Sequence, residues 1–403
     1  MDSSKWRLFY FGSMDRTPVI AGVGLSDYPK APDLDGVQHH ALAMQRALAD
    51  CGLPKAEIDG YINAGGSGGM MVDDAVTMAE YLRIDHRYID STMTGGSSFE
   101  FHVQHGAAAI RDGACDTILV TYGSDQLSRM GRMLGTGGFQ RPGSHVAGPV
   151  QYEVPYGNSL VGAYAMAARR HMHEFGTTSE QLAEIAVGVR EFAALNPHAM
   201  YRDPITVDDV VSSRMIADPL HKLDCCAITD GGGAFVMTTA ERARDLAQSP
   251  VYVLGAAGAQ THWNISQMPD FTTTAGAKSG PEAFARAGLT PDDVDMVMFY
   301  DSFTITVLLL LEGMGFCKRG EGGPFVDEGH LKRGGKLPLN TDGGGLSSSH
   351  PGMRGIFLII EAVRQLRGQA GEAQVPDCNV ALAAGSGGWL SAIGTAILGK
   401  EHP

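Results

Sequence analysis

The chain has 403 residues, of which 44% are apolar, so it can form two large domains or one duplicated architecture with a sizeable core. Its formal net charge of −14 argues against a nucleic-acid partner, because binding a polyanion requires a dense basic surface. No run of about eighteen apolar residues is present, so we expect no membrane span and a cytoplasmic location.

The six cysteines show neither the density of a secreted disulfide framework nor the paired spacing of a metal site. We therefore expect reduced thiols, and no metal or cofactor bound by this chain. The cysteines are Cys51, Cys115, Cys225, Cys226, Cys317 and Cys378.

Residues 1–16 are interpreted as an N-terminal extension, because strand-like sequence begins only at Thr17. From there, segments recur in the same order in two halves, 17–248 and 249–403. "TPVIAGVG" from Thr17 is echoed by "SPVYVLGAAG" from Ser249, and "AEIDGYINAGG" by "DDVDMVMFYDS". A glycine-rich turn, an amphipathic helix and a strand then follow in each half, the strand beginning at Cys115 or Cys378.

This alternation of strands and helices predicts βαβ units and mainly parallel sheets covered by helices. We expect an α/β protein whose halves pack in five α/β/α/β/α layers. Between about 124 and 220 lies an insertion too long for a plain connection, with helical periodicity over 162–175 and 179–195. Its first part, "GTGGFQRPGSHVAGP", is predicted to be a loop. We expect this insertion to form a cap subdomain over the strand ends.

Three stretches are more specific: "HMHEFGTTSEQLAEIAVGVREFAALNPHA", "SRMIADPLHKLDCCAITDGGGAFVM" and "LNTDGGGLSSSHPGMRG". They resemble the thiolase superfamily, in the branch of sterol-carrier-protein-type thiolases and lipid-transfer-like steroid side-chain aldolases. The resemblance implies a thiolase fold with duplicated βαβαβαββ halves, a tight homodimer and an acyl-coenzyme A substrate. It also implies a small partner protein that combines a zinc ribbon with an OB-fold and completes the coenzyme A site.

Two of the four loops that carry chemistry in such thiolases have lost their cysteine. In the first loop, Met93 stands at the position of the nucleophile, and methionine cannot form an acyl-thioester. We expect Met93 to be a gap-filling apolar side chain. In the fourth loop the chain reads "GSGG" up to Gly388, while Cys378 should lie at the far end of the preceding strand. The N–H groups of Gly387 and Gly388 are candidates for binding a thioester oxygen.

The other two loops retain polar candidates. The resemblance places Tyr300 at a catalytic position and retains His350 as an acid or base. Asp301, Ser302 and Ser349 beside them are candidate substrate- or oxyanion-binding residues. Asp301 is predicted either to orient a neighbour or to cap the following helix.

These residues favour a carbon–carbon lyase that cleaves a 3-hydroxyacyl-CoA by a retro-aldol reaction, giving a short acyl-CoA and an aldehyde or ketone. Tyr300 would take the proton of the β-hydroxyl and His350 would protonate the enolate, although the two roles could be exchanged. One alternative is an acetyl-CoA acetyltransferase that recruits a cysteine from elsewhere. Another is a non-catalytic subunit that binds acyl-CoA or lipid. The acyl substituent, steroid or otherwise, is left open and would be decided by the cap.

Overall fold

The computed structural model describes residues 15–65, 74–131, 148–157 and 159–402. The extension predicted over residues 1–16 lies almost wholly outside these ranges, as does most of the loop predicted after residue 135. Within them, nine strands form one hydrogen-bonded sheet in the order β3-β2-β4-β7-β1-β8-β11-β10-β9. No helix in the described ranges is long and apolar enough to cross a membrane.

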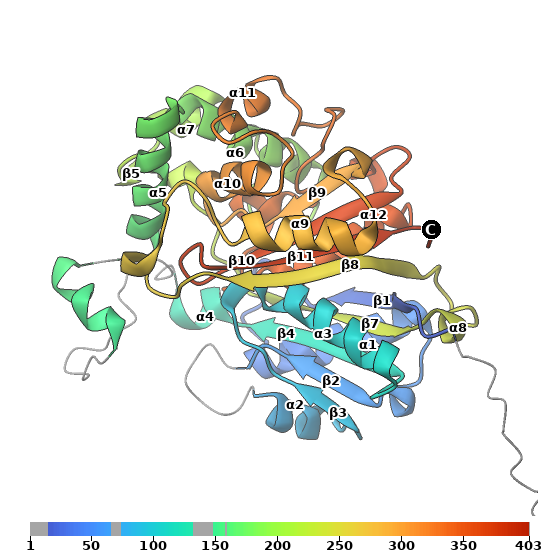
Figure 1. Ribbon diagram of the computed structural model, residues 1–403. Helices are drawn as coiled ribbons and strands as arrows, with labels where there is room; N and C mark the ends of the chain where they lie inside the picture. The colour runs from blue at the N-terminus through green and yellow to red at the C-terminus, as the bar shows by residue number, and fades with distance from the viewer. Residues whose placement is uncertain (1–14, 66–73, 132–147, 158, 403) are drawn as a thin grey trace, which may run out of the picture.

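The predicted duplication is confirmed by the order of the strands in the two halves (Figure 1). Read from the middle of the sheet outwards, β1-β7-β4-β2 of the first half corresponds to β8-β11-β10-β9 of the second. An isolated parallel bridge between Val297 and Leu339 stands where the second half would have its counterpart of β3. Short 3-10 turns precede both β2 and β9, the strands that lie in the echoed segments "AEIDGYINAGG" and "DDVDMVMFYDS".

The elements of the first half are β1 (Pro18–Leu25), α1 (Gly36–Cys51), β2 (Gly60–Asn63), α2 (Ala75–Leu82), β3 (Tyr88–Asp90), α3 (Ser98–Asp112), β4 (Thr117–Ser124), β7 (Gly231–Thr239) and α8 (Ala240–Ala243). Those of the second half are β8 (Val251–Gln260), α9 (Gly276–Ala287), β9 (Met296–Phe299), α10 (Thr304–Gly313), α11 (Gly322–Asp327), α12 (Gly355–Leu366), β10 (Val380–Gly387) and β11 (Ala392–Gly399).

The prediction of mainly parallel sheets is wrong. Only the pairs β2–β3, β2–β4 and β9–β10 are parallel, whereas the other five pairs of the large sheet are antiparallel. The physical reason is that the last strand of each half, β7 or β11, inserts between the first strand and the parallel strands. The halves then join edge to edge where β1 pairs antiparallel with β8, at Val19–Tyr252 and Ile20–Val251.

The helices lie in three layers, and three clusters of buried apolar side chains join these helices to the strands. Helix α1 packs on the outer face of the first half, and α9 and α10 cover the outer face of the second. Helices α3 and α12 lie between the halves, where each contacts strands of both. Their buried side chains, such as Phe99 and Ile356, belong to the central core. The five-layered arrangement expected from the sequence follows from these contacts.

The insertion is mainly helical and lies against the second half. Thr178 and Gln181 form a capping box, in which each side chain accepts the other residue's backbone N–H, so helix α6 begins where the sequence predicted. Helices α5 and α6 contact α10, and α6 also contacts α11 and the turn Gly344–Ser348 (Figure 1). The elements are α4 (Gln126–Met130), α5 (Leu160–Phe175), α6 (Ser179–Leu195), α7 (Val207–Ser212), β5 (Met215–Ala217) and β6 (Leu220–His221).

Candidate active site

Tyr300 directly follows β9, at the carboxyl end of a parallel strand pair. Its backbone N–H donates to the Ala384 carbonyl of β10 at 2.9 Å, and its side chain is only 4% exposed. The phenol accepts from the Arg354 N–H at 3.3 Å and donates a long hydrogen bond of 3.5 Å to the Gly352 carbonyl. A methyl group built on Gly96 would lie 2.2–2.3 Å from the phenol ring and hydroxyl. The glycine of the first loop therefore provides the space for Tyr300.

His350 lies beside Tyr300, although the two are fifty residues apart in the sequence. The ring centroids are 5.3 Å apart, with the rings nearly perpendicular at 83°. His350 is held through its backbone N–H, which donates to Thr229 Oγ1 at 3.0 Å. Its side chain is 3% exposed, and within the described residues neither ring nitrogen has a hydrogen-bond partner. Buried polar atoms are normally paired, so these nitrogens are available to a ligand.

Burial sets the protonation states of this pair. It raises the pKa of the Tyr300 phenol well above its ordinary value, with further increases from nearby Cys226, Tyr164 and Tyr122. Burial and, to a smaller extent, the positive charge of Arg354 together lower the pKa of His350 to about 3. At neutral pH the phenol therefore keeps its proton and the imidazole is uncharged.

Asp301 takes part in a buried ionic network. Its carboxylate accepts from the N–H groups of Gly345 and Leu346 at 2.7 and 3.1 Å, and it lies 3.6 Å from Nε of Arg354. Arg354 also donates to both carboxylate oxygens of Asp342, each at 2.6 Å. Burial raises the pKa of Asp301, whereas Arg354 opposes that rise.

Of the two roles predicted for Asp301, capping of the following helix is wrong, because α10 begins at Thr304 without a side-chain cap. The aspartate instead fixes the turn that leads to His350.

The two serine candidates differ in their contacts. Ser349 shares a 3.0 Å hydrogen bond with Thr229 Oγ1, and its carbonyl accepts from Arg354 at 2.7 Å. Its contacts are therefore with the loop around His350. Ser302 is 5% exposed, and its hydroxyl forms no hydrogen bond of normal geometry within the described residues.

The first and fourth loops touch each other next to this pair. A methyl group on Gly95 would lie 3.0 Å from the Gly388 nitrogen and 3.1 Å from Gly387 Cα. Met93 precedes this contact and is 43% exposed, with its sulfur accepting from the Gly95 N–H at 3.2 Å. The expected gap-filling role of Met93 is therefore wrong, because a side chain at the surface fills no gap in the core.

Cysteine reactivity is suppressed around the site. Cys226 lies near Tyr300, and its backbone N–H donates to the Ser302 carbonyl at 2.9 Å. Burial raises the pKa of its thiol, which disfavours the nucleophilic thiolate. Cys378 is 6% exposed and precedes β10, at the opposite end of the strand from Gly387, and burial raises its pKa to about 12.

Sequence reasoning missed several buried polar residues at the site. Tyr164 of α5 packs its ring 4.5 Å from that of Phe303. Arg354 is fully buried, as is Glu100 of α3, whose carboxylate oxygens lack partners within the described residues. The sequence signal that could have identified Arg354 and Glu100 was an ionisable residue inside an otherwise apolar or glycine-rich segment.

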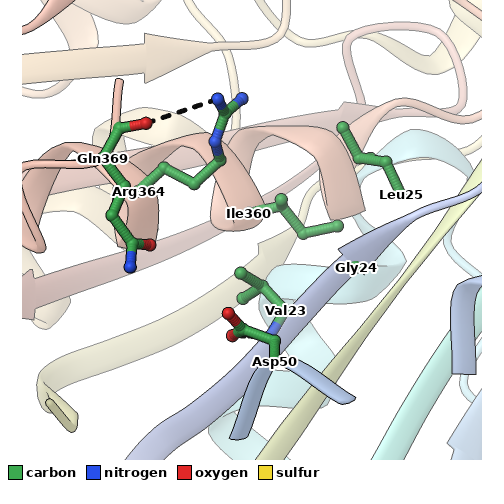
Figure 2. A pocket seen from close by; sticks show the side chains of 7 residues that line it. All are labelled: Val23, Gly24, Leu25, Asp50, Ile360, Arg364 and Gln369. Carbon is green, nitrogen blue, oxygen red and sulfur yellow. Dashed lines mark hydrogen bonds between the residues drawn. The ribbon is translucent and has the colours of Figure 1, made fainter. Parts of the chain in front are cut away.

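A separate pocket of about 250 Å³ lies between β1 and α12, away from these loops (Figure 2). Asp50 and Arg364 line it, and Arg364 donates to the Gln369 carbonyl at 3.5 Å. None of the candidate residues described above borders this pocket.

Two matching halves with helices between them, and four loops meeting at one point, define a protein of the thiolase class. Residues 257–400 match the family model described as "Thiolase C-terminal domain-like". A steroid side-chain-cleaving aldolase of Thermomonospora curvata is 35% identical over 382 residues, covering 91% of this chain and 95% of that protein. The chain belongs to the steroid side-chain aldolase branch of the thiolase superfamily.

Two further relatives support this placement. A 17-hydroxy-3-oxo-4-pregnene-20-carboxyl-CoA lyase of Mycobacterium tuberculosis is 35% identical over 378 residues, covering 91% of this chain and 96% of that protein. A solved structure of an Ltp2-ChsH2(DUF35) aldolase superposes with a TM-score of 0.84 at 32% identity, covering 96% of this chain and 98% of that one.

Proposed function

We propose that this protein is a carbon–carbon lyase that cleaves a 3-hydroxyacyl-CoA by a retro-aldol reaction into a shorter acyl-CoA and an aldehyde or ketone. The observation that carries the proposal is the contact between Tyr300 and His350, with ring centroids 5.3 Å apart, in a buried site whose nucleophile position holds Met93. Relatives named as an aldolase and a lyase, similar over most of the chain, support the same chemistry.

The protonation states favour His350 as the base and Tyr300 as the acid, which exchanges the roles preferred from the sequence. A phenol whose pKa is raised keeps its proton and can donate it, whereas an uncharged imidazole without a hydrogen-bond partner among the described residues can accept one. The low pKa makes His350 a weak base. Proton removal is helped because the thioester accepts the electrons of the breaking Cα–Cβ bond in the same step and becomes an enolate.

The proton count balances over one cycle. His350 takes the proton of the β-hydroxyl, the oxygen forms a carbonyl, and the Cα–Cβ bond electrons pass to the thioester as an enolate. Tyr300 then gives its proton to Cα, and the imidazolium returns a proton to the phenolate. The N–H groups of Gly387 and Gly388, on the loop in contact with Gly95, would hold the enolate oxygen.

We propose that no acyl-cysteine forms in this reaction. Met93 cannot act as a thiolate, and burial raises the pKa of Cys226, the thiol that lies near Tyr300. This argues against the alternative of an acetyltransferase with a recruited cysteine. Because the substrate carries its acyl group on coenzyme A, we propose that the reaction needs no further cofactor bound to this chain.

The substrate and partners are proposed by analogy. A relative named as cleaving steroid side chains supports an acyl group attached to a steroid or a similarly bulky ring system. A solved structure whose name joins two components supports a small partner, which we propose to be a zinc-ribbon and OB-fold protein. Because β3 is an edge strand of the sheet, we also propose a homodimer that pairs this edge, acting in the cytoplasm.

The test is incubation with a branched 3-hydroxyacyl-CoA, with and without a copurifying partner, with both products followed by mass spectrometry. Tyr300→Phe should lower turnover by about 10² or more, as expected for loss of a positioned acid. Tyr61→Phe is the matched control, because Tyr61 is a buried tyrosine of β2 bonded to Thr121 at 2.7 Å, outside this site. Binding without cleavage across several acyl groups would instead identify a non-catalytic acyl-CoA-binding subunit.

A further inference from the structure

Tyr122, a buried tyrosine of the first half, is hydrogen-bonded to the loop that carries His350. It lies near the end of β4 and is 4% exposed. Its hydroxyl donates to the Pro351 carbonyl at 2.5 Å and accepts from the Met353 N–H at 3.0 Å. These partners are 229 and 231 residues away in the sequence, so the two bonds join the first half to a site loop of the second.

The same short turn, residues 351–354, is also bonded to Tyr300. The Tyr300 phenol donates to the Gly352 carbonyl at 3.5 Å and accepts from the Arg354 N–H at 3.3 Å. The polar groups along the turn therefore alternate between the two phenols: Tyr122 bonds those of residues 351 and 353, and Tyr300 those of 352 and 354. Glycine suits position 352, because its φ of 90° lies in the left-handed region.

Tyr122 is the more firmly held of the two phenols. Its backbone pairs with Gly233 in the antiparallel ladder between β4 and β7. Its ring packs against those of Phe99 and His40, whose centroids are 5.4 and 6.3 Å away. The hydrogen bonds of the Tyr300 phenol are longer, and both go to the turn. The position of Tyr300 therefore depends on where Tyr122 holds that turn.

His350 depends on the same turn. Its backbone N–H donates to Thr229 Oγ1 at 3.0 Å, and the next residue, Pro351, is the one bonded to Tyr122. The imidazole itself has no hydrogen-bond partner within the described residues. Its place is therefore set by packing and by these two backbone anchors, and not by a bond to the ring.

We propose that Tyr122 is a positioning residue for the carbon–carbon cleavage, because its hydroxyl holds the turn that places Tyr300 and His350 beside each other. The inference rests on the proposed function, in which these two residues move protons to and from the substrate. Tyr122 itself takes up no proton in that cycle. A displacement of about 1 Å can lower a rate about 10²-fold, so one hydroxyl away from the chemistry can control it.

The first test is Tyr122→Phe, which removes the hydroxyl and keeps the ring. The kcat for a 3-hydroxyacyl-CoA should fall about 10- to 100-fold, with KM changed by less than about twofold, because the reacting groups move while the binding surface remains. Tyr61→Phe is the matched control, since it removes another buried phenol, which bonds Thr121 of β4 at 2.7 Å. It should leave kcat within about twofold.

Gly352→Ala disturbs the same contact from the side of the turn, and it also serves if Tyr122→Phe does not fold. The added methyl would lie 3.2 Å from the Tyr122 hydroxyl, at a φ of 90°. Gly368→Ala is its control, because Gly368 has a φ of 70° but a methyl there would meet no other described residue within 4 Å, its chain neighbours aside. Gly352→Ala should lower kcat about tenfold or more, and Gly368→Ala should not.

A second measurement reads the position of Tyr300 without turnover. Carbon-13 placed at Cζ of the 12 tyrosines allows the phenols to be followed by NMR, and the Tyr300 signal is the one that disappears in Tyr300→Phe. Tyr122→Phe should shift this signal, because the hydrogen bonds of the Tyr300 phenol change with the turn. Tyr61→Phe should leave it in place.

An unchanged kcat in Tyr122→Phe would overturn the inference, as would equal losses in Tyr122→Phe and Tyr61→Phe. An unchanged Tyr300 signal in Tyr122→Phe would overturn it as well. Failure of the proposed function is read separately, from an absence of cleavage by the unmodified protein. In that case the NMR comparison would still decide whether Tyr122 fixes the position of Tyr300.

Discussion

The two central helices, α3 and α12, occupy equivalent places in the two halves, yet they serve the site differently. At the start of α12, Arg354 is fully buried and bonded to Asp342 and Ser349, with Asp301 3.6 Å away. At the start of α3, Gly95 and Gly96 offer space instead of charge. The second half thus supplies the charged groups and the two residues that we propose to react, whereas the first half supplies space for them.

Glu100 of α3 differs from Arg354 of α12 in that its buried side chain has no ionic partner among the described residues. It is buried on α3 with neither carboxylate oxygen paired within the described residues, and its side chain lies against Gly355, Gly385 and Gly394. Burial raises its pKa well above the ordinary value. A duplicated fold therefore preserves the positions of helices while the polar partners at each position diverge.

The largest effect is expected from Arg354→Met, which removes the cation of the second half. Asp301 and Asp342 would lose their partner, and breaking a buried ion pair costs about 3–5 kcal/mol. The free energy of unfolding in urea measures this. Arg46→Met is the control, because its pair with Asp27 is exposed (45% and 58%) and should be worth about 0–1 kcal/mol. Similar losses for both variants would contradict the assigned network.

Gly96→Ala tests the space provided by the first half. The added methyl would lie within 2.3 Å of the Tyr300 hydroxyl, so the phenol must move and turnover should fall about 10²-fold. The control is Gly36→Ala at the start of α1, where the nearest atom would be 3.6 Å away. Turnover by Gly96→Ala at the level of this control would show that Tyr300 is not held as described.

Glu100→Gln should stabilise the protein above pH 7. A carboxyl whose pKa is raised on folding contributes stability at low pH that is lost as pH rises past its unfolded value of about 4.3. The neutral amide avoids that loss, so the gain should be about 1 kcal/mol or more at pH 8 and should shrink toward pH 4.5. Chemical denaturation at the two pH values measures it, and a pH-independent difference would contradict an unpaired Glu100.

At pH 7, His350→Gln should have the smallest effect of the four variants, and its effect should grow as a change in slope when the pH falls. Because the folded pKa of His350 is about 3, below the unfolded value of about 6.5, its contribution is complete above pH 6.5 and is lost as pH falls toward 3. Unfolding free energies from pH 7 to 4 should therefore fall less steeply in the variant, by up to about 1.4 kcal/mol per pH unit. His40, also buried with a pKa lowered to about 3, gives the comparison in the first half.

Much of the fold was predictable because it repeats. The echoed segments correspond to β1 and β8, β2 and β9, and the α3–β4 and α12–β10 units, and Thr178 marked the start of α6. Strand direction was not predictable in this way, since alternation with helices looks the same whether the last strand of a half runs parallel or inserts antiparallel.

Site residues could be predicted where they stand in a recognisable loop motif. They could not be predicted where the site forms by contact between segments far apart in the sequence. Tyr300 and His350 stand out in their loops and lie together. The contacts of Asp301 depend on Gly345 and Arg354, and Tyr164 arrives from the insertion, so long-range packing decides both. Burial also shifts the pKa values, which is why the acid and base roles that we propose could not be chosen from residue types alone.

The central claim is that carbon–carbon cleavage proceeds without an acyl-cysteine, and intact-protein mass spectrometry during steady-state cleavage of a 3-hydroxyacyl-CoA tests it most directly. The account predicts that only the unmodified protein mass is present while acyl-CoA and carbonyl product accumulate. A protein population heavier by the acyl group, and lost in Cys226→Ala, would contradict it.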